Sequence, residues 1–399
     1  MEWKEVTLGE ISSKIGDGLH GTPKYDDEGP YYFINGNNLN CGKIIIKDDT
    51  KRVGKDEFVK NQKELNERTI LVSINGTIGN VAKYNNELCI VGKSACYINV
   101  IKDVDKEFIY YVLTSANFKR NITNEATGTT IKNVSLKQMR EYKFNIPCNI
   151  SDQRRIASIL SSLDRKIELN NKINADLEEM AQAIFKNWFV DFEPFKDGKF
   201  VDSELGMIPE GWKVGRLTDV IKLMPGGTPK TSEPLYWDNG TIPFFSPKDV
   251  NGVYCFATEK HITEAGLNKC SSNLYPKDTI FITCRGTVGK VCLVACDMAM
   301  NQSNYAIKAI DGYSQYYVFF LVKSVVERLI KKSNGAVFSA ITSKDFDEEI
   351  LIPSQKAVED FTNVIDGFFR RIFTIGTEST RLSLLRDTLL PRLMSGEIE

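Results

Sequence analysis

Apolar and small residues recur every three or four positions between Ser151 and Val190. The positions that share this spacing are Ile156, Leu160, Leu163, Ile167, Asn170, Asn174, Leu177, Ala181, Ile184 and Trp188. Over about five heptads, such spacing is typical of a coiled-coil seam. Ser151 is a suitable N-cap and Pro194 ends the pattern. We therefore predict one long helix, which needs a partner of similar length to cover its apolar stripe.

The same spacing returns after Pro353. The second set of positions is Val358, Phe361, Ile365, Phe368, Ile372, Ile375, Ser379, Leu382, Arg386, Leu389 and Leu393. We predict that the two helices form an antiparallel pair within one chain. A generic bundle element or a homodimer helix is the alternative, but Asn170 and Asn174 on the seam favour a pair with a defined register.

The two halves of the chain resemble each other at an offset of 206 to 210 residues. Arg68–Gly79 matches Asp278–Gly289, and both segments have the pattern of a strand, a tight turn and a second strand. The halves differ in the segments most suited to contact a ligand, for example Gly18–Tyr25 against Gly226–Ser232. A duplicated scaffold with two different faces suits a molecule that reads two different sites, although ordinary drift after duplication also produces such differences.

The repeat and the helices predict the domain organisation. Short β-rich runs mix with a few helices in each half without regular βαβ alternation, so we predict the α+β class. Two similar globular domains, residues 1–150 and 194–353, would be joined and separated by two long antiparallel coiled-coil helices at 151–193 and 354–399.

Composition is ordinary for a globular protein of two or three domains, with 399 residues, 42% hydrophobic and 26% charged. The charged start and the absence of an apolar run of about 18 residues predict a cytoplasmic protein without a membrane span. The formal charge of -1 is not that of a strongly basic nucleic-acid binder. If the chain holds DNA, its positive charge must be local, or partner subunits must provide it.

We expect no catalytic residue, no metal site and no cofactor on this chain. It has nine cysteines without a C-x-x-C pair, and two histidines, which argues against a zinc site and a histidine base. Val91–Ser94 resembles the end of a phosphate-binding loop, but Glu87 occupies the position of the required first glycine. The chain also lacks the Asn/Asp-Pro-Pro-Tyr tetrapeptide of amino-methyltransferases.

Two repeated features are candidates for DNA contact. Gly76–Gly79 and Gly286–Gly289 predict tight turns, in which glycine supplies positive φ and a close approach to phosphate. Thr127–Asn133 and Ser333–Ser339 are polar, glycine-containing loops with side chains that can donate to phosphates and base edges, and a capped solvent loop is the alternative. The candidate DNA-binding residues are Lys24, Asn37, Asn38, Asn75, Thr77, Lys93, Thr129, Thr130, Lys132, Asn133, Lys230, Lys248, Arg285, Thr287, Lys290, Gln302, Asn304, Asn334 and Ser339.

Four stretches carry a resemblance to a known family: Asp152–Asp164, Ile184–Phe192, Leu205–Trp212 and Leu389–Glu397. With the repeat and the paired helices, the chain resembles a type I restriction-modification specificity (S) subunit over nearly its whole length. Before Arg381 the likeness in the second helix is weaker.

The resemblance implies two target recognition domains that each read half of a split asymmetric DNA site, with the helices as a ruler. It implies two modification subunits that use S-adenosylmethionine to methylate adenine N6. It further implies two restriction subunits that use ATP and Mg to translocate and cleave DNA. The chemistry would belong to these partners.

Other classes of function remain open at this point. A methylation-only system would use the same kind of subunit. A stand-alone methyltransferase or nuclease would methylate or cleave DNA by itself, and a coiled-coil scaffold would bind no duplex even beside a modification subunit.

Overall fold

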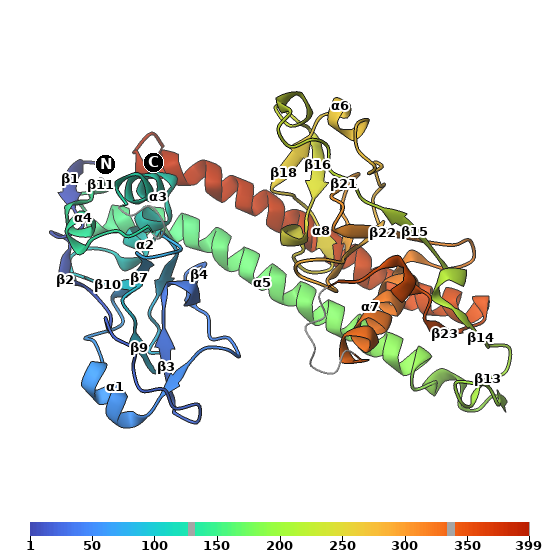
Figure 1. Ribbon diagram of the computed structural model, residues 1–399. Coiled ribbons are helices and arrows are strands. Elements are labelled where there is room, and N and C mark those ends of the chain that lie inside the picture. The colour runs from blue at the N-terminus through green and yellow to red at the C-terminus, as the bar shows by residue number, and fades with distance from the viewer. Residues whose placement is uncertain (127–131, 333–339, 399) are drawn as a thin grey trace. The chain divides into compact units, whose positions relative to one another are not determined.

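The chain divides into two units in the computed structural model (Figure 1). The structure describes residues 1–126, 132–332 and 340–398. Unit 1 comprises Met1–Lys166 and Leu382–Glu399, and unit 2 comprises Ile167–Arg381. Within the described ranges, no helix is both long enough and apolar enough to cross a membrane.

Two long helices contribute residues to both units. They are α5 (Ile150–Phe189) and α8 (Gln355–Met394). Helix α5 begins at Ile150, one residue before the predicted start at Ser151. Asn149 rather than Ser151 is its N-cap, because Asn149 Oδ1 accepts the backbone N–H of Ser151 at 2.8 Å. The two helices match the predicted pair closely in length and position.

The main sheet of unit 1 is antiparallel and has the strand order β2-β10-β7-β8. Its strands are β2 (Ser12–Asp17), β7 (Thr69–Ser73), β8 (Val81–Lys83) and β10 (Ala95–Val100). A smaller sheet, β6-β3-β9, consists of β3 (Tyr31–Ile34), β6 (Arg52–Val53) and β9 (Cys89–Val91). The remaining elements are β1 (Trp3–Thr7), β11 (Lys143–Pro147), β4 (Leu39–Asn40), β5 (Lys43–Ile44), η1 (Gly36–Asn38), α1 (Lys55–Asn61), α2 (Lys106–Thr114), α3 (Ala116–Glu125) and α4 (Leu136–Glu141).

Alternation along the central strands of unit 1 builds two cores. Ile70 and Val72 of β7 face the core that contains Phe108 of α2, whereas Leu71 between them faces the core under the smaller sheet, with Ile34. Successive side chains of a strand point to opposite faces, and both faces are covered here. This explains why every residue of β7 and β10 is buried.

Unit 2 repeats this plan. Its main sheet has the order β15-β22-β19-β20-β17 and its smaller sheet has the order β18-β16-β21. The strands are β15 (Ile221–Pro225), β16 (Ile242–Phe245), β17 (Tyr254–Cys255), β18 (Lys260–Ile262), β19 (Ile280–Thr283), β20 (Val291–Val294), β21 (Ala299–Met300) and β22 (Asn304–Ala309). The other elements are β12 (Phe200–Val201), β13 (Ile208–Pro209), β14 (Lys213–Arg216), β23 (Glu349–Ile352), α6 (Glu264–Leu267), α7 (Gln315–Lys332), η2 (Glu193–Phe195), η3 (Leu217–Asp219), η4 (Pro234–Tyr236), η5 (Pro247–Asp249) and η6 (Ser343–Phe346).

The equivalent strand orders confirm the predicted α+β repeat. Strands β2, β10, β7 and β8 of unit 1 correspond in order to β15, β22, β19 and β20 of unit 2. Unit 2 adds β17, which pairs in parallel with β20. In unit 1 the corresponding contact is a single parallel bridge between Gly42 and Ala82.

Contacts within each unit show that α5 and α8 are antiparallel, as predicted. In unit 1, Asp164 of α5 pairs with Arg386 of α8 at 2.7 Å. In unit 2, Asn174 Nδ2 donates to the Ile372 carbonyl at 3.2 Å, and the rings of Trp188 and Phe361 lie 5.9 Å apart. Residue numbers rise along one helix as they fall along the other.

The seam residues identified from the sequence are all buried or half-buried. The sequence pattern missed a second buried face of α5, because Phe185 and Phe189 lie outside the seam positions. Phe185 packs against Phe320 of α7 with ring centroids 5.6 Å apart, and Phe189 packs against Trp212 at 5.8 Å. In unit 2, α5 is therefore also part of the core of the globular body.

Candidate nucleic-acid interface

Five loop segments meet at one end of the main sheet of unit 1. We call them the unit 1 loop cluster: Leu19–His20, Asn35–Asn37, Asn75–Thr77, Lys93–Ser94 and Lys132–Asn133. Backbone hydrogen bonds run from Lys93 N to Leu19 O at 3.0 Å, from Ile74 N to Ser94 O at 2.9 Å and from Gly76 N to Lys132 O at 3.2 Å. Segments far apart in sequence thus form one surface.

Side-chain hydrogen bonds fix the base of this cluster. The Ser94 hydroxyl accepts from Gly36 N and donates to Asn35 Oδ1, both at 2.9 Å. Asn75 Nδ2 donates to Asn133 Oδ1 at 3.1 Å. These amides are half-buried, whereas the candidates Asn37, Thr77, Lys93 and Lys132 are exposed. The cluster therefore presents ammonium, hydroxyl and amide groups on a rigid frame.

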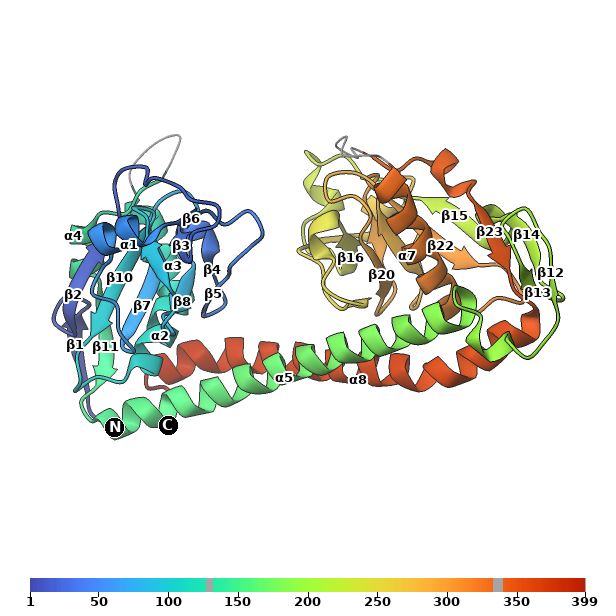
Figure 2. The ribbon, with the colours of Figure 1, turned by 90° about the horizontal axis from the view of Figure 1, so that it is seen from below.

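The unit 1 loop cluster lies at the end of the sheet away from α5 (Figure 2). Strand β10 begins at Ala95 beside the cluster and ends at Val100. Beyond that opposite end, Asp105 N donates to Gln153 Oε1 of α5 at 2.8 Å. The long helix of this unit therefore leaves the loops uncovered.

Unit 2 has an equivalent arrangement, the unit 2 loop cluster, made of Gly226–Thr228, Ser246–Lys248, Arg285–Thr287 and Asn301–Gln302. Cys284 N donates to Ser303 O at 2.8 Å, and Gly227 N to Met300 O at 3.0 Å. The Thr228 hydroxyl donates to Gln302 Oε1. Lys248, Arg285, Thr287 and Gln302 are exposed. Burial raises the pKa of the Cys284 thiol, below the hairpin, to about 12, so this group stays neutral.

The predicted glycine turns are present in both clusters. Gly76 and Gly79 have φ of 73° and 86°, and Gly286 and Gly289 have φ of 81° and 86°. Gly79 N and Gly289 N close their turns on Ser73 O and Thr283 O at 2.9 and 2.8 Å. A Cβ added at Gly76 or Gly286 would meet no atom of the described residues within 4 Å. The structural role of these glycines is therefore established.

Two candidates are corrected by their burial. Asn38 is 5% exposed, and its amide donates to Ile45 O at 3.0 Å while its oxygen accepts from Asn35 N at 3.0 Å. Asn304 is 2% exposed and donates to Asn301 Oδ1 at 2.6 Å. Both side chains brace their loops from within, so we remove them from the set of direct contacts.

Other candidates lie elsewhere. Lys24 and Lys230 are exposed in the segments that follow β2 and β15. Thr129, Thr130, Asn334 and Ser339 lie outside the described residues. Lys290 lines a separate pocket and does not belong to the unit 2 loop cluster.

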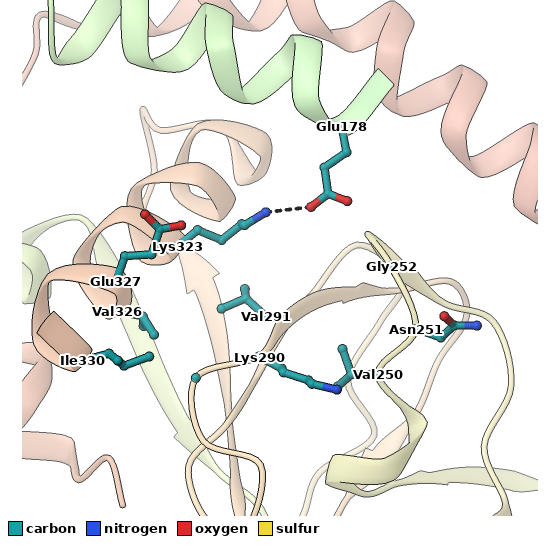
Figure 3. Close-up of a pocket in the computed structure, with 11 residues that line it drawn as sticks. Glu178, Val250, Asn251, Gly252, Lys290, Val291, Lys323, Val326, Glu327 and Ile330 are labelled. Carbon is teal, nitrogen blue, oxygen red and sulfur yellow. Dashed lines mark hydrogen bonds and ion pairs between the residues drawn. The ribbon is translucent and has the colours of Figure 1, made fainter. Parts of the chain in front are cut away.

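That pocket has a volume of about 400 Å³ and lies between α5, α7 and the start of β20 (Figure 3). Glu178 of α5 and Lys323 of α7 form an ion pair of 2.6 Å above it. The apolar wall of the pocket is formed by Val250, Val291, Val326 and Ile330. Asn251 and Gly252 line its edge. The pocket is open to solvent, and Glu178 and Lys323 already pair with each other. We therefore regard it as a weaker candidate for a ligand site than the loop clusters.

The sequence analysis missed His20 as a member of the unit 1 loop cluster. Its exposed ring bonds Asp17 Oδ2 at 2.6 Å, next to the Leu19 carbonyl that binds Lys93 N. The signal was present, because Gly18–Tyr25 differs from Gly226–Ser232 in the second half.

The fold and the two loop clusters define a two-unit repeat protein with one polar loop surface in each unit. A family model described as "Type I restriction modification DNA specificity domain" matches residues 1–179 and 209–367. This chain belongs to that family. The family assignment makes it a DNA-specificity component of a type I restriction-modification system and not an enzyme.

Relatives cover the chain almost completely. The type I restriction enzyme MjaIX specificity subunit of Methanocaldococcus jannaschii is 28% identical over 386 residues, covering 94% of this chain and 86% of that protein. The HindI specificity subunit of Haemophilus influenzae is 26% identical over 469 positions, covering 100% of both. A crystal structure of the type I S subunit from M. genitalium has a TM-score of 0.56 at 17% identity, covering 98% and 96% of the two chains, and shares the fold.

Proposed function

We propose that each unit reads one half of a bipartite, asymmetric site on double-stranded DNA through its loop cluster. The observation that carries this proposal is the combination of one backbone frame with two sets of exposed side chains. Asn35 N bonds Asn38 Oδ1 at 3.0 Å, and in the equivalent turn Ser246 N bonds Asp249 Oδ2 at 2.7 Å. The exposed residue of that turn is Asn37 in unit 1 and Lys248 in unit 2.

The chemistry of the exposed groups supports this reading. Lysine and arginine neutralise phosphates and position a protein on the duplex, whereas amide side chains read base edges. Lys93, Lys132 and Arg285 supply cations, and Asn37 and Gln302 supply amides. Each good bidentate amide or guanidinium contact discriminates between bases by about 1–3 kcal/mol.

Partners and cofactors are a further part of the proposal. We propose two modification subunits docked on α5 and α8, which hold S-adenosylmethionine and methylate adenine N6 in the site that this chain selects. Two restriction subunits with ATP and Mg would complete the nuclease. The target adenine must leave the base stack for methylation. This chain would bind none of these cofactors and would contribute recognition.

The two long helices would set the number of unread base pairs between the half-sites. Both helices have segments in both units, and a helix has a fixed rise per residue. The spacer of the DNA site would then be a consequence of helix length.

A domain exchange tests the proposal. Residues 1–150 are replaced by those of another family member, and methylated sites are mapped by single-molecule sequencing in cells that carry the modification subunit. We expect one half-site to change while the other half-site stays the same. A change in both half-sites, or in neither, contradicts independent reading by the two units.

A further inference from the structure

The helix seam in unit 2 contains a polar layer within an otherwise apolar stripe. Asn170 of α5 is 1% exposed and Ser379 of α8 is 9% exposed. Asn170 Nδ2 donates to Glu378 Oε2 at 2.7 Å, and Asn174 Nδ2 donates to the Ile372 carbonyl at 3.2 Å. The two helices are therefore held by side-chain amides at this level as well as by apolar packing.

This layer does not maximise stability. Asn174 Oδ1 and Ser379 Oγ are buried, and among the described residues neither has a hydrogen-bond partner. Such atoms destabilise a helix pair relative to leucine or isoleucine at the same positions. Coiled coils keep a polar residue on the seam at this cost when it distinguishes one register from its alternatives.

The contact between Asn170 and Glu378 discriminates between registers. Sliding α8 by one heptad would replace Glu378 with Arg371 or with Leu385. Leucine offers no polar group, and arginine offers only donors, which could pair with the Asn170 oxygen but not with its nitrogen. In either shifted register the Asn170 amide nitrogen loses its side-chain acceptor. The bond from Asn174 contributes less discrimination, because every register presents a backbone carbonyl.

A second contact restricts α8 from its other side. A Cβ added at Gly376 would lie 2.2 Å from Cε2 of Phe256, the residue that follows β17. Phe256 is itself packed against Phe373, with ring centroids 5.6 Å apart. A one-heptad shift would bring Phe369 or Ser383 to the position of Gly376. Neither side chain fits where a single methyl group already overlaps Phe256.

We propose that Asn170 and Gly376 are positioning residues that hold α8 in one register, Asn170 against α5 and Gly376 against the body of unit 2. We call the four residues Asn170, Glu378, Gly376 and Phe256 the register lock. Their further role, which rests on the proposed function, is to fix the spacer length in the DNA site, because a slipped helix would change the ruler.

Distance measurement on the full chain without DNA tests the lock directly. Nitroxides are attached through p-acetylphenylalanine in place of Lys172 and Glu359, which are both exposed and lie at different levels along the helix pair, so that a slip changes their distance directly and the native cysteines stay unlabelled. In the otherwise unsubstituted chain, double electron–electron resonance should give one narrow distribution of the distance between the two nitroxides. In Asn170→Leu/Phe256→Ala, we expect a second population with a helix offset of about 10 Å, the length of seven helical residues.

The matched control is Asn171→Leu/Phe256→Ala. Asn171 is exposed next to Asn170, so this control retains the polar contact and should keep the single distance. An unchanged single distance in Asn170→Leu/Phe256→Ala would overturn the register lock.

A charge exchange provides an independent test that does not remove the aromatic ring. Asn170→Asp places a carboxylate against the Glu378 carboxylate, which leaves two acceptors facing each other, and the distance distribution should broaden. Adding Glu378→Arg restores a donor–acceptor pair across the two helices and should restore the narrow distribution. Failure of this rescue overturns the proposal even if Phe256→Ala variants do not fold.

The effect on DNA recognition is measured separately. Methylation mapping with Asn170→Leu/Phe256→Ala should reveal a second spacer length between unchanged half-sites. If the distance distribution splits while the spacer stays single, the register lock stands and the ruler in the proposed function is wrong. If neither changes, the lock itself is wrong.

Discussion

The Asp164 carboxylate of α5 lies 2.7 Å from the Arg386 guanidinium of α8, and its other oxygen accepts the Tyr111 hydroxyl of α2 at 2.6 Å. Asp164 thus joins three helices of unit 1. The acceptor and its two donors are only partly exposed, so each hydrogen bond is worth more here than at the surface. Burial contributes most to the raised pKa of Tyr111, and the hydrogen bond to Asp164 contributes next. The phenol therefore stays protonated and remains a donor.

Asp164→Ala should lower the stability of unit 1 by about 2–4 kcal/mol, because it leaves Arg386 and Tyr111 without their shared acceptor. Thermal unfolding followed by circular dichroism measures this change. Asp387→Asn is the control, since Asp387 is the more exposed neighbour of Arg386 and should shift stability by less than about 0.5 kcal/mol. Equal effects of the two substitutions would contradict the joining role of Asp164.

Alanine at the two glycines of the second hairpin should have unequal effects. Both have positive φ, which costs alanine about 1–2 kcal/mol. At Gly286 a Cβ meets no described atom within 4 Å, whereas at Gly289 it would lie 2.8 Å from Ile330 Cδ1 and 2.9 Å from Val326 Cγ1. Gly289→Ala should therefore lower the melting temperature more than Gly286→Ala. The reverse order would show that the turn is not packed on α7 as described.

Removal of loop-cluster cations should weaken the binding of any duplex and its salt dependence. The slope of log affinity against log salt concentration is negative. For Lys132→Ala and Arg285→Ala, we expect its magnitude to decrease by about 0.9 per lost phosphate contact. Fluorescence anisotropy with a non-specific duplex, in the presence of the modification subunit, measures this slope. Lys102→Ala, an exposed lysine at the opposite end of the unit 1 sheet, should leave it unchanged. Unaltered slopes in both cluster variants would refute these contacts.

Stability should fall as pH rises above about 8.5, where thiols of the unfolded chain ionise. The thiols of Cys89, Cys255 and Cys284 have their pKa raised to about 12, mainly by burial. Between about 8.5 and 12 the folded chain keeps these protons and the unfolded chain loses them, so the unfolded state is favoured. Melting temperatures measured from pH 7 to 10 should decrease, and Cys284→Ser should reduce the dependence.

Insertion of one heptad into α5, with a matching heptad in α8, should lengthen the spacer and leave both half-sites unchanged. Seven helical residues add about 10 Å, which corresponds to at most about three base pairs. Methylation mapping detects this change. A constant spacer in a folded insertion variant would rule out the helices as the ruler.

Periodicity and the internal repeat were sufficient to predict the helices and the α+β repeat, because burial on one face leaves a period in the sequence. The same pattern missed Phe185 and Phe189, since α5 has a second buried face that only unit 2 creates. Ser151 was predicted as the cap from its residue type, and Asn149 is of an equally suitable type, so only the observed start of α5 at Ile150 distinguishes them.

The candidate site was harder to predict. The glycine turns carry their conformational requirement in the sequence, and Thr77, Lys93, Arg285 and Gln302 are exposed as expected. Asn38 and Asn304 are of the same residue type as good base-reading groups, yet both point into the protein. Side-chain direction in an irregular loop depends on long-range contacts, which composition and spacing do not encode.

Unit 1 is assembled from two stretches of chain, Met1–Lys166 and Leu382–Glu399, whereas unit 2 is continuous. Leu393, which is 2% exposed, belongs to the core that also holds Leu160. During synthesis, unit 2 is thus the first to have all its residues outside the ribosome. The core of unit 1 stays incomplete until Leu382–Glu399 has been synthesised. Premature termination before residue 382 would therefore destabilise unit 1 more than unit 2, although most of unit 1 is translated first.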